Sequence, residues 1–99
     1  MPNSRYIAGV AYERRCKKKW EETGWQVTRA AGSRGPFDLV AVHEGNGAVI
    51  LAQCKVLKTM AQAKRLVRDW VPALKSNDNY LQLLTIWVRE EKTVVDTWA

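Results

Sequence analysis

Three separate segments of this 99-residue chain place an acidic or amide side chain where a buried apolar residue is expected: Glu13, Asp38 and Gln53. Carboxylate and amide oxygens are ligands that Mg²⁺ prefers in proteins. Lys55 falls two residues after Gln53 in an expected strand, so the two side chains point to the same side of a sheet. An ammonium group there can orient an attacking water or stabilise the charge that grows on a phosphate. The pattern predicts metal-assisted phosphodiester hydrolysis, with Lys55 as the catalytic cation.

Each of these residues also has an ordinary structural explanation. Glu13 lies in the apolar stripe of an expected helix, and at the edge of that stripe it would reach solvent or pair with Lys17, four residues on. Asp38 would cap a turn at the start of its strand. Gln53 and Lys55 are also typical of a strand that emerges into solvent. The prediction of a catalytic site therefore depends on these three segments meeting in space.

Hydrophobic spacing predicts the elements that must position these side chains. A second helix begins near Met60 and ends near Trp70, because Pro72 lacks an amide donor and clashes with the preceding turn. The full set is a helix over 7–23, strands over 25–31, 37–43 and 48–56, the second helix, and strands over 80–88 and 93–98. The order α-β-β-β-α-β-β predicts one α/β domain over residues 1–99, with a mixed five-stranded sheet flanked by helices. The first three strands are expected to form an antiparallel meander.

The charge balance indicates a polyanionic partner. Sixteen Lys and Arg against ten Asp and Glu give a net charge of +6, although a solubilising surface would have the same composition. Neither a signal peptide nor a bilayer-spanning apolar run is found, so a cytoplasmic protein is expected. Cys16 and Cys54 lack metal-ligand spacing and are expected to be buried, reduced thiols.

At these residues the chain resembles the PD-(D/E)XK nucleases, and among them the archaeal and viral Holliday junction resolvases. The resemblance covers roughly residues 5–70. It rests on Tyr12-Glu13-Arg14 in the first helix, on Gly24 to Arg29, on Ala31 to Arg34, on Asp38 to Ala41, and on Gln53-Cys54-Lys55.

The resemblance implies a restriction-endonuclease-like core and a homodimer that nicks four-way DNA junctions, using Mg²⁺ or, as a substitute, Mn²⁺. It implies that Ser33 lies beside the catalytic site and that Arg29 lies near the scissile backbone. Independently of the family, Ser33 and Arg34 lie on a glycine-flanked turn, which lets backbone and side chains approach a phosphate closely. The candidate DNA-binding residues are Arg14, Arg29, Ser33, Arg34, Lys58, Lys64 and Arg65.

Gln53 departs from the family pattern, which usually has glutamate at this position. Glutamine in place of glutamate removes one negative charge from the metal ligands, so weaker metal binding is expected. Modification-dependent restriction endonucleases resemble this variant in using a Gln-x-Lys strand. Other functions thus remain open: a nuclease for single-stranded, flap or modified duplex DNA, a catalytically silent DNA-binding module, or an RNA-binding accessory protein.

Overall fold

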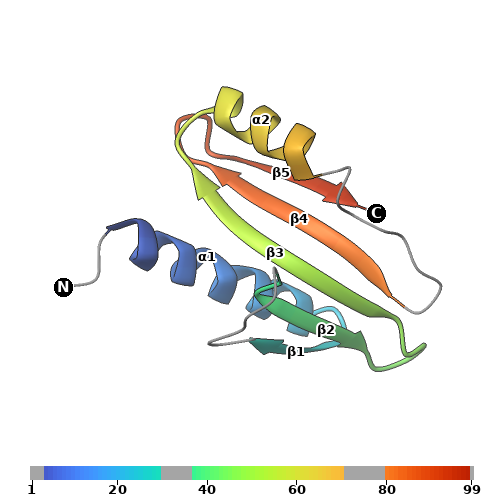
Figure 1. Cartoon of the computed structure of the whole chain (residues 1–99). Helices are drawn as coiled ribbons and strands as arrows, with labels where there is room; N and C mark the ends of the chain where they lie inside the picture. Colours follow the sequence, from blue (N-terminus) through green and yellow to red (C-terminus); the bar gives the residue numbers. More distant parts are fainter. Residues whose placement is uncertain (1–3, 30–36, 71–79, 99) are drawn as a thin grey trace.

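The computed structural model describes residues 4–29, 37–70 and 80–98 of the chain. Within these ranges the elements are α1 (Ser4–Glu21), β1 (Trp25–Arg29), β2 (Leu39–His43), β3 (Val49–Leu57), α2 (Met60–Trp70), β4 (Leu81–Val88) and β5 (Thr93–Trp98) (Figure 1). The predicted order is confirmed, and so is the end of the second helix at Trp70. The predicted turn over 32–36 lies outside the described residues.

The five strands form one mixed sheet in the order β1-β2-β3-β4-β5. The first three strands pair antiparallel, as the meander prediction requires, and β5 pairs antiparallel with β4. β3 and β4 are parallel, and α2 makes the crossover between them. This arrangement confirms the α/β class and agrees with a restriction-endonuclease-like core.

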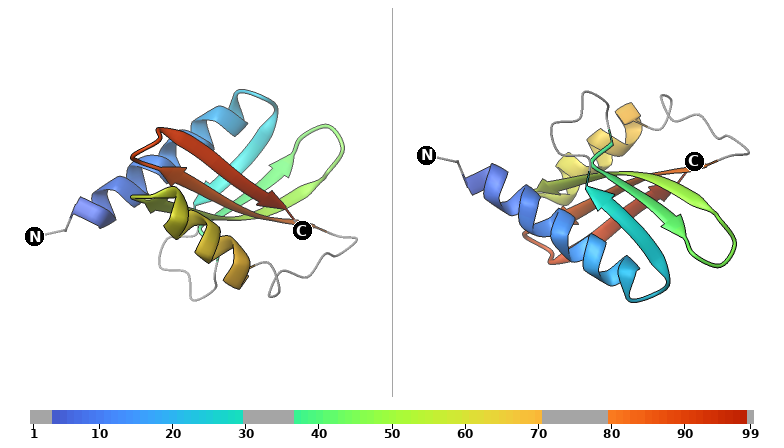
Figure 2. Two further views of the ribbon diagram at one scale, coloured as in Figure 1. Left: turned by 90° about the horizontal axis from the view of Figure 1, so that it is seen from above. Right: turned by 90° about the horizontal axis from the view of Figure 1, so that it is seen from below.

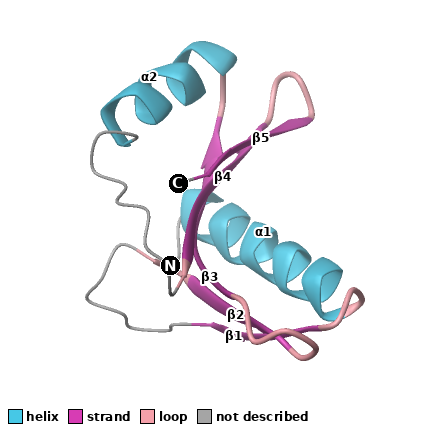
Figure 3. Ribbon diagram, turned by 90° about the vertical axis from the view of Figure 1, so that its right-hand side faces the viewer, coloured by secondary structure: helices cyan, strands magenta, loops and turns pink. Residues whose placement is uncertain are grey.

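The two helices cover opposite faces of the sheet (Figures 2 and 3). α1 lies against β1, β2 and β3, and α2 lies against β3 and β4. Each face has its own core. Beneath α1 the buried residues include Tyr12, Cys16, Ala52 and Cys54. Beneath α2 they are Ala63, Leu84, Ile86 and Val88. Side chains along β3 therefore alternate between the two faces, as predicted from its sequence.

Several helix and strand limits differ from the sequence prediction by one to three residues. α1 begins at Ser4 rather than at residue 7. β2 begins at Leu39 rather than at residue 37, because the side chain of Asp38 takes up a backbone donor of β3 at that point. Tyr12 of α1 also belongs to the core and is only 5% exposed. No helix in the described ranges has the length and apolar character needed to cross a bilayer.

The core beneath α2 should carry much of the stability. Leu84 is fully buried there, so Leu84→Ala is expected to lower the free energy of unfolding by about 3 kcal/mol. The melting temperature should fall by roughly 15 °C for a domain of this size. The same truncation at Leu81, which is 47% exposed on the same strand, should cost less than about 1 kcal/mol. If chemical denaturation gave the same loss of unfolding free energy for Leu84→Ala and Leu81→Ala, the assignment of this core would be contradicted.

Candidate active site

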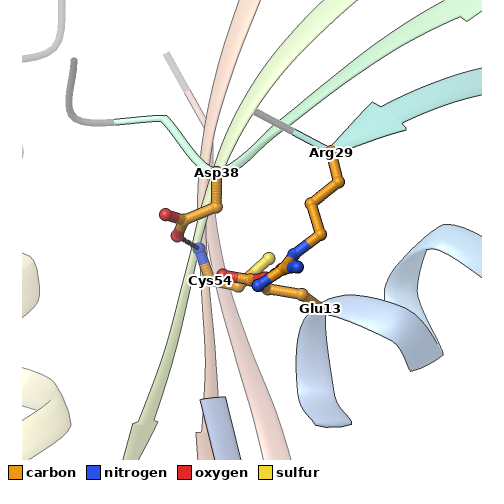
Figure 4. Close-up of polar contacts among 4 residues, drawn as sticks. All are labelled: Glu13, Arg29, Asp38 and Cys54. Carbon is orange, nitrogen blue, oxygen red and sulfur yellow. Dashed lines mark hydrogen bonds and ion pairs between the residues drawn. The ribbon is translucent and has the colours of Figure 1, made fainter. Parts of the chain in front are cut away.

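Asp38 is fixed against β3 by two hydrogen bonds. Its backbone N–H donates to the carbonyl of Ala52 at 2.8 Å, and its Oδ2 accepts from the backbone N–H of Cys54 at 2.9 Å (Figure 4). The carboxylate oxygen thus takes the place of a backbone carbonyl as the acceptor for a β3 N–H group. This explains how an aspartate stands between apolar neighbours. The bond joins two strands sixteen residues apart and is not the turn cap that was the alternative, and the catalytic role stays a prediction.

Gln53 precedes Cys54 on β3. The regular register of β2 with β3 ends at the pair Leu39–Ala52, and the N–H of Asp38 donates to the carbonyl of the same Ala52, so Asp38 lies outside the ladder. Strand alternation places the Gln53 side chain on the face opposite to that of Ala52 and Cys54. That face is the one that α2 covers, because Ala52 and Cys54 belong to the core beneath α1. Lys55 follows on the same face and is exposed. The prediction that Gln53 and Lys55 share a face is confirmed.

The side-chain oxygen of Gln53 is buried and, within the described chain, accepts no hydrogen bond. An orphaned buried oxygen costs free energy unless a donor or a cation satisfies it. In the described ranges, no three His, Cys, Asp or Glu side chains gather as a metal site. A metal ion here would therefore depend on the amide oxygen of Gln53. The Asp38 carboxylate is held on the backbone N–H of the next residue, Cys54. Both candidate donors are hard oxygens, the ligand type that Mg²⁺ prefers.

Glu13 approaches β3 from the α1 side of the sheet. Its Oε2 accepts a hydrogen bond from Nε of Arg29 at 2.7 Å, as Figure 4 shows. The side chain of Glu13 is 14% exposed and that of Arg29 is 34% exposed, so the pair is partly shielded from water. The alternative that Glu13 pairs with Lys17 is wrong, because Lys17 binds Glu21 at 3.0 Å.

Cys54 lies between the two carboxylates. The pKa of its thiol is raised, first by its hydrogen bond to Cys16, then by burial, and further by the negative charges of Asp38 and Glu13. Both carboxylates thus act on the same residue of β3. The structure brings Asp38 onto the backbone of Cys54, next to Gln53, and the charge of Glu13 reaches the same cysteine from α1. That all three oxygens meet around one ion stays a prediction.

The candidate DNA-binding residues divide by location. Arg14 is exposed on α1, and Lys58, Lys64 and Arg65 are exposed at or near the start of α2. Arg29 is half-buried in its pair with Glu13. Ser33 and Arg34 lie outside the described residues.

One functional contribution was missed from the sequence, namely the backbone N–H of Cys54 that holds Asp38. No side-chain signal could have found it, because every non-proline residue carries the same donor.

Comparison with known proteins gives one family match. The family model for archaeal Holliday junction resolvase (Hjc) matches residues 4–68, and no curated protein matched the chain. The matched region runs from α1 into α2 and includes all four residues of the candidate site: Glu13, Asp38, Gln53 and Lys55. Since the match covers more than half of the chain, the protein belongs to the archaeal Holliday junction resolvase family.

Proposed function

We propose that this protein is a metal-dependent DNA endonuclease that nicks four-way junctions as a homodimer. One observation carries the proposal. The Asp38 carboxylate is held by the backbone N–H of Cys54, the residue after Gln53, whose buried side-chain oxygen accepts no hydrogen bond from the described residues. Membership of a family of junction-resolving nucleases supports the substrate class.

Asp38 and Gln53 would hold Mg²⁺. Glu13, predicted from the sequence as the third ligand, pairs with Arg29 on the α1 side of the sheet, so it is assigned to positioning Arg29 and not to this ligand pair. Mn²⁺ should substitute, because it also accepts oxygen ligands. When bound, the ion would supply Lewis acidity and lower the pKa of a coordinated water. The hydrogen bond from Cys54 fixes the rotamer of Asp38, so this ligand needs little reorganisation on metal binding.

Lys55 and Arg29 supply positive charge on either side of this segment. The Lys55 side chain shares a face of β3 with Gln53, where its ammonium would orient the attacking water and stabilise charge on the phosphate. Glu13 orients the Arg29 guanidinium through a 2.7 Å hydrogen bond, so that Arg29 can contact the DNA backbone near the scissile bond. Ser33 is proposed to act beside the site.

DNA binding would rest mainly on phosphate contacts. The proposed set of Arg14, Arg34, Lys58, Lys64 and Arg65 is expected to track backbones without reading sequence, so binding should weaken steeply with salt. A junction presents two equivalent strands, which suits the two sites of a twofold dimer. Val94 and Trp98 are exposed apolar side chains on the edge strand β5, and they support a protein partner at that edge.

Cleavage of labelled four-way junctions, beside linear duplex of the same sequence, tests the proposal. With Mg²⁺ or Mn²⁺, junctions should be nicked at least about tenfold faster than duplex, a difference of about 1.4 kcal/mol in activation free energy. Chelation should abolish the reaction. Equal rates on both substrates would reject the junction-resolving assignment and leave a general nuclease.

A second candidate function is a DNA-binding module without hydrolytic activity. Gln53 favours it specifically, because the amide removes one negative charge from the ligand set. Restoring a carboxylate by Gln53→Glu distinguishes the two functions. If the protein is an active nuclease, the variant should need about tenfold less Mg²⁺ for half-maximal cleavage, since an added anion beside the ion contributes more than 1.4 kcal/mol even at partial solvent screening.

Gln26→Glu is the matched control, because Gln26 is exposed on β1 and the substitution changes the net charge equally. It should leave the Mg²⁺ requirement unchanged. Activity that arises only with Gln53→Glu would show that the natural chain is a silent binder. An unchanged Mg²⁺ requirement in Gln53→Glu would remove residue 53 from the proposed ligand set.

A further inference from the structure

Two cavities adjoin on the α1 side of the sheet. α1 packs against β1, β2 and β3, and the cavities lie where β4 and β5 continue the sheet beside the helix (Figure 3). The larger cavity has a volume of about 300 Å³ and the smaller one of about 220 Å³. Because Tyr12 and Arg15 line both cavities, the two form one surface, which we call the α1 groove.

The α1 groove is separate from the candidate active site. Tyr12 points from α1 towards β4, where its hydroxyl shares a hydrogen bond of 2.5 Å with that of Thr85. Its neighbour Glu13 points towards β1, where it binds Arg29. Gln53 belongs to the opposite face of the sheet. No residue proposed for cleavage or for junction binding lines the groove among the described residues.

Exposed cations outnumber carboxylates along the α1 groove. Four cations and two carboxylates line it: Arg15, Lys18, Lys19 and Arg89, against Glu22 and Asp96. Both carboxylates line the larger cavity, whereas the charged lining of the smaller cavity consists of two arginines. Within the described ranges, none of the four cations takes part in an ion pair. The groove therefore suits a chain of phosphates.

Aromatic side chains stand among these cations. Tyr12 and Trp20 line the larger cavity, and Trp87 lines the smaller one. The Arg15 guanidinium lies over the Trp87 ring, 4.9 Å from its centroid. Unpaired bases stack on aromatic rings and on guanidinium planes, whereas the faces of bases in a duplex are already covered by their neighbours. Cations interleaved with aromatic groups thus fit an unpaired strand better than a duplex.

We propose that the α1 groove is a binding site for single-stranded DNA. Phosphates bind the exposed cations, and one base stacks on the Arg15–Trp87 pair. Glu22 and Asp96 accept hydrogen bonds from the amino groups of bases in the larger cavity. Membership of a DNA-resolving family favours DNA over RNA. The inference goes beyond the proposed cleavage and does not depend on it.

Fluorescence anisotropy with a labelled oligothymidylate of about ten nucleotides and the full chain, in the presence of a chelator, tests the proposal. The double variant Arg15→Gln with Lys19→Gln should raise the Kd for this strand at least about tenfold at 0.1 M salt. The slope of log Kd against log salt concentration should fall by about 1.4, because two phosphate contacts are lost. The Kd for linear duplex should change less than about twofold, since the residues proposed to bind duplex lie elsewhere.

The matched control is Arg68→Gln with Lys92→Gln. Both residues are exposed and lie outside the α1 groove, and the net charge changes equally. This control should leave the Kd for the oligothymidylate within about twofold of that of the natural chain. Circular dichroism confirms that each variant is folded. If the control weakens binding as much as the groove variant does, or if duplex binding falls as much as single-strand binding, the proposal is overturned.

Arg15→Lys separates stacking from charge. Lysine keeps the positive charge but lacks the guanidinium plane, so the Kd for the oligothymidylate should rise at least about threefold with an unchanged salt slope. Polyphosphate, a polyanion without bases, should compete at least about tenfold more weakly than an unlabelled strand of equal charge. Natural affinity in Arg15→Lys, or equal competition by polyphosphate, would overturn the stacking of bases in the groove.

Two further competitors test the ligand class. Free thymidine monophosphate, at the same nucleotide concentration as the strand, should not displace the oligothymidylate, and oligouridylate should bind no more tightly than it does. Displacement by the mononucleotide would assign the groove to free nucleotides, and tighter binding of oligouridylate would assign it to RNA. Because the assay needs neither metal nor cleavage, a chain that nicks junctions without binding the strand contradicts only this inference. A chain that binds the strand without nicking junctions contradicts only the proposed function.

Discussion

Asp38→Asn is expected to reduce the kcat for junction cleavage by at least about a thousandfold, since metal-assisted catalysis contributes several kcal/mol of transition-state stabilisation. The substitution keeps the shape of the side chain and removes its charge. An asparagine oxygen can still accept the hydrogen bond from the Cys54 amide, which Asp38 receives at 2.9 Å. Single-turnover cleavage at saturating junction DNA measures the effect.

Stability and DNA binding distinguish this loss from simple unfolding. A hydrogen bond to a charged group is about twice as strong as a neutral one, so the free energy of unfolding should fall by only about 1 kcal/mol. Asp69→Asn is the matched control, because Asp69 is exposed on α2, and its kcat should stay within a factor of about two. Cleavage by Asp38→Asn at the natural rate would remove Asp38 from the site.

Lys55→Met is expected to lower kcat by about a hundredfold to a thousandfold, which is the usual cost of removing one donor that stabilises transition-state charge. Methionine keeps an unbranched side chain of similar length without the ammonium group. Because Lys55 is exposed, the substitution should hardly change stability. The Kd for junction DNA should rise only slightly, since one charge among many contacts is lost.

A loss in binding that equals the loss in cleavage would show that Lys55 is a phosphate contact and not a catalytic cation. Lys92→Met provides the matched control. Lys92 lies in the turn between β4 and β5 with a φ of 49°, and an unbranched side chain is tolerated there as well as lysine is. Its cleavage rate should match that of the natural chain, measured with the same junction preparation.

Sequence patterns predicted the elements well where hydrophobic periodicity was strong. The limits of β5 and the end of α2 at Trp70 were predicted correctly. The start of β2 was not, because the competing interaction there is a long-range hydrogen bond that the Cys54 N–H donates to the Asp38 carboxylate. Local propensity contains no information about a partner sixteen residues away.

The candidate site was predictable in its residue types but only partly in its geometry. Period-two alternation was enough to place Gln53 and Lys55 on one face. It could not reveal that the Gln53 oxygen is buried without a partner among the described residues. Nor could it reveal that Glu13 binds Arg29 and not Lys17, because helical spacing counts only neighbours on the same helix.

The sequence by itself determined the order of helices and strands, the family resemblance, and the presence of oxygen ligands and an ammonium group at motif spacing. Only the tertiary structure decided which of these side chains are adjacent. It placed the Asp38 carboxylate on the backbone N–H of Cys54, and it put Cys16 of α1 and Cys54 of β3 into one core cluster. The physical reason is that periodicity fixes the face on which a side chain lies, whereas strand register and helix packing fix its neighbours across the chain.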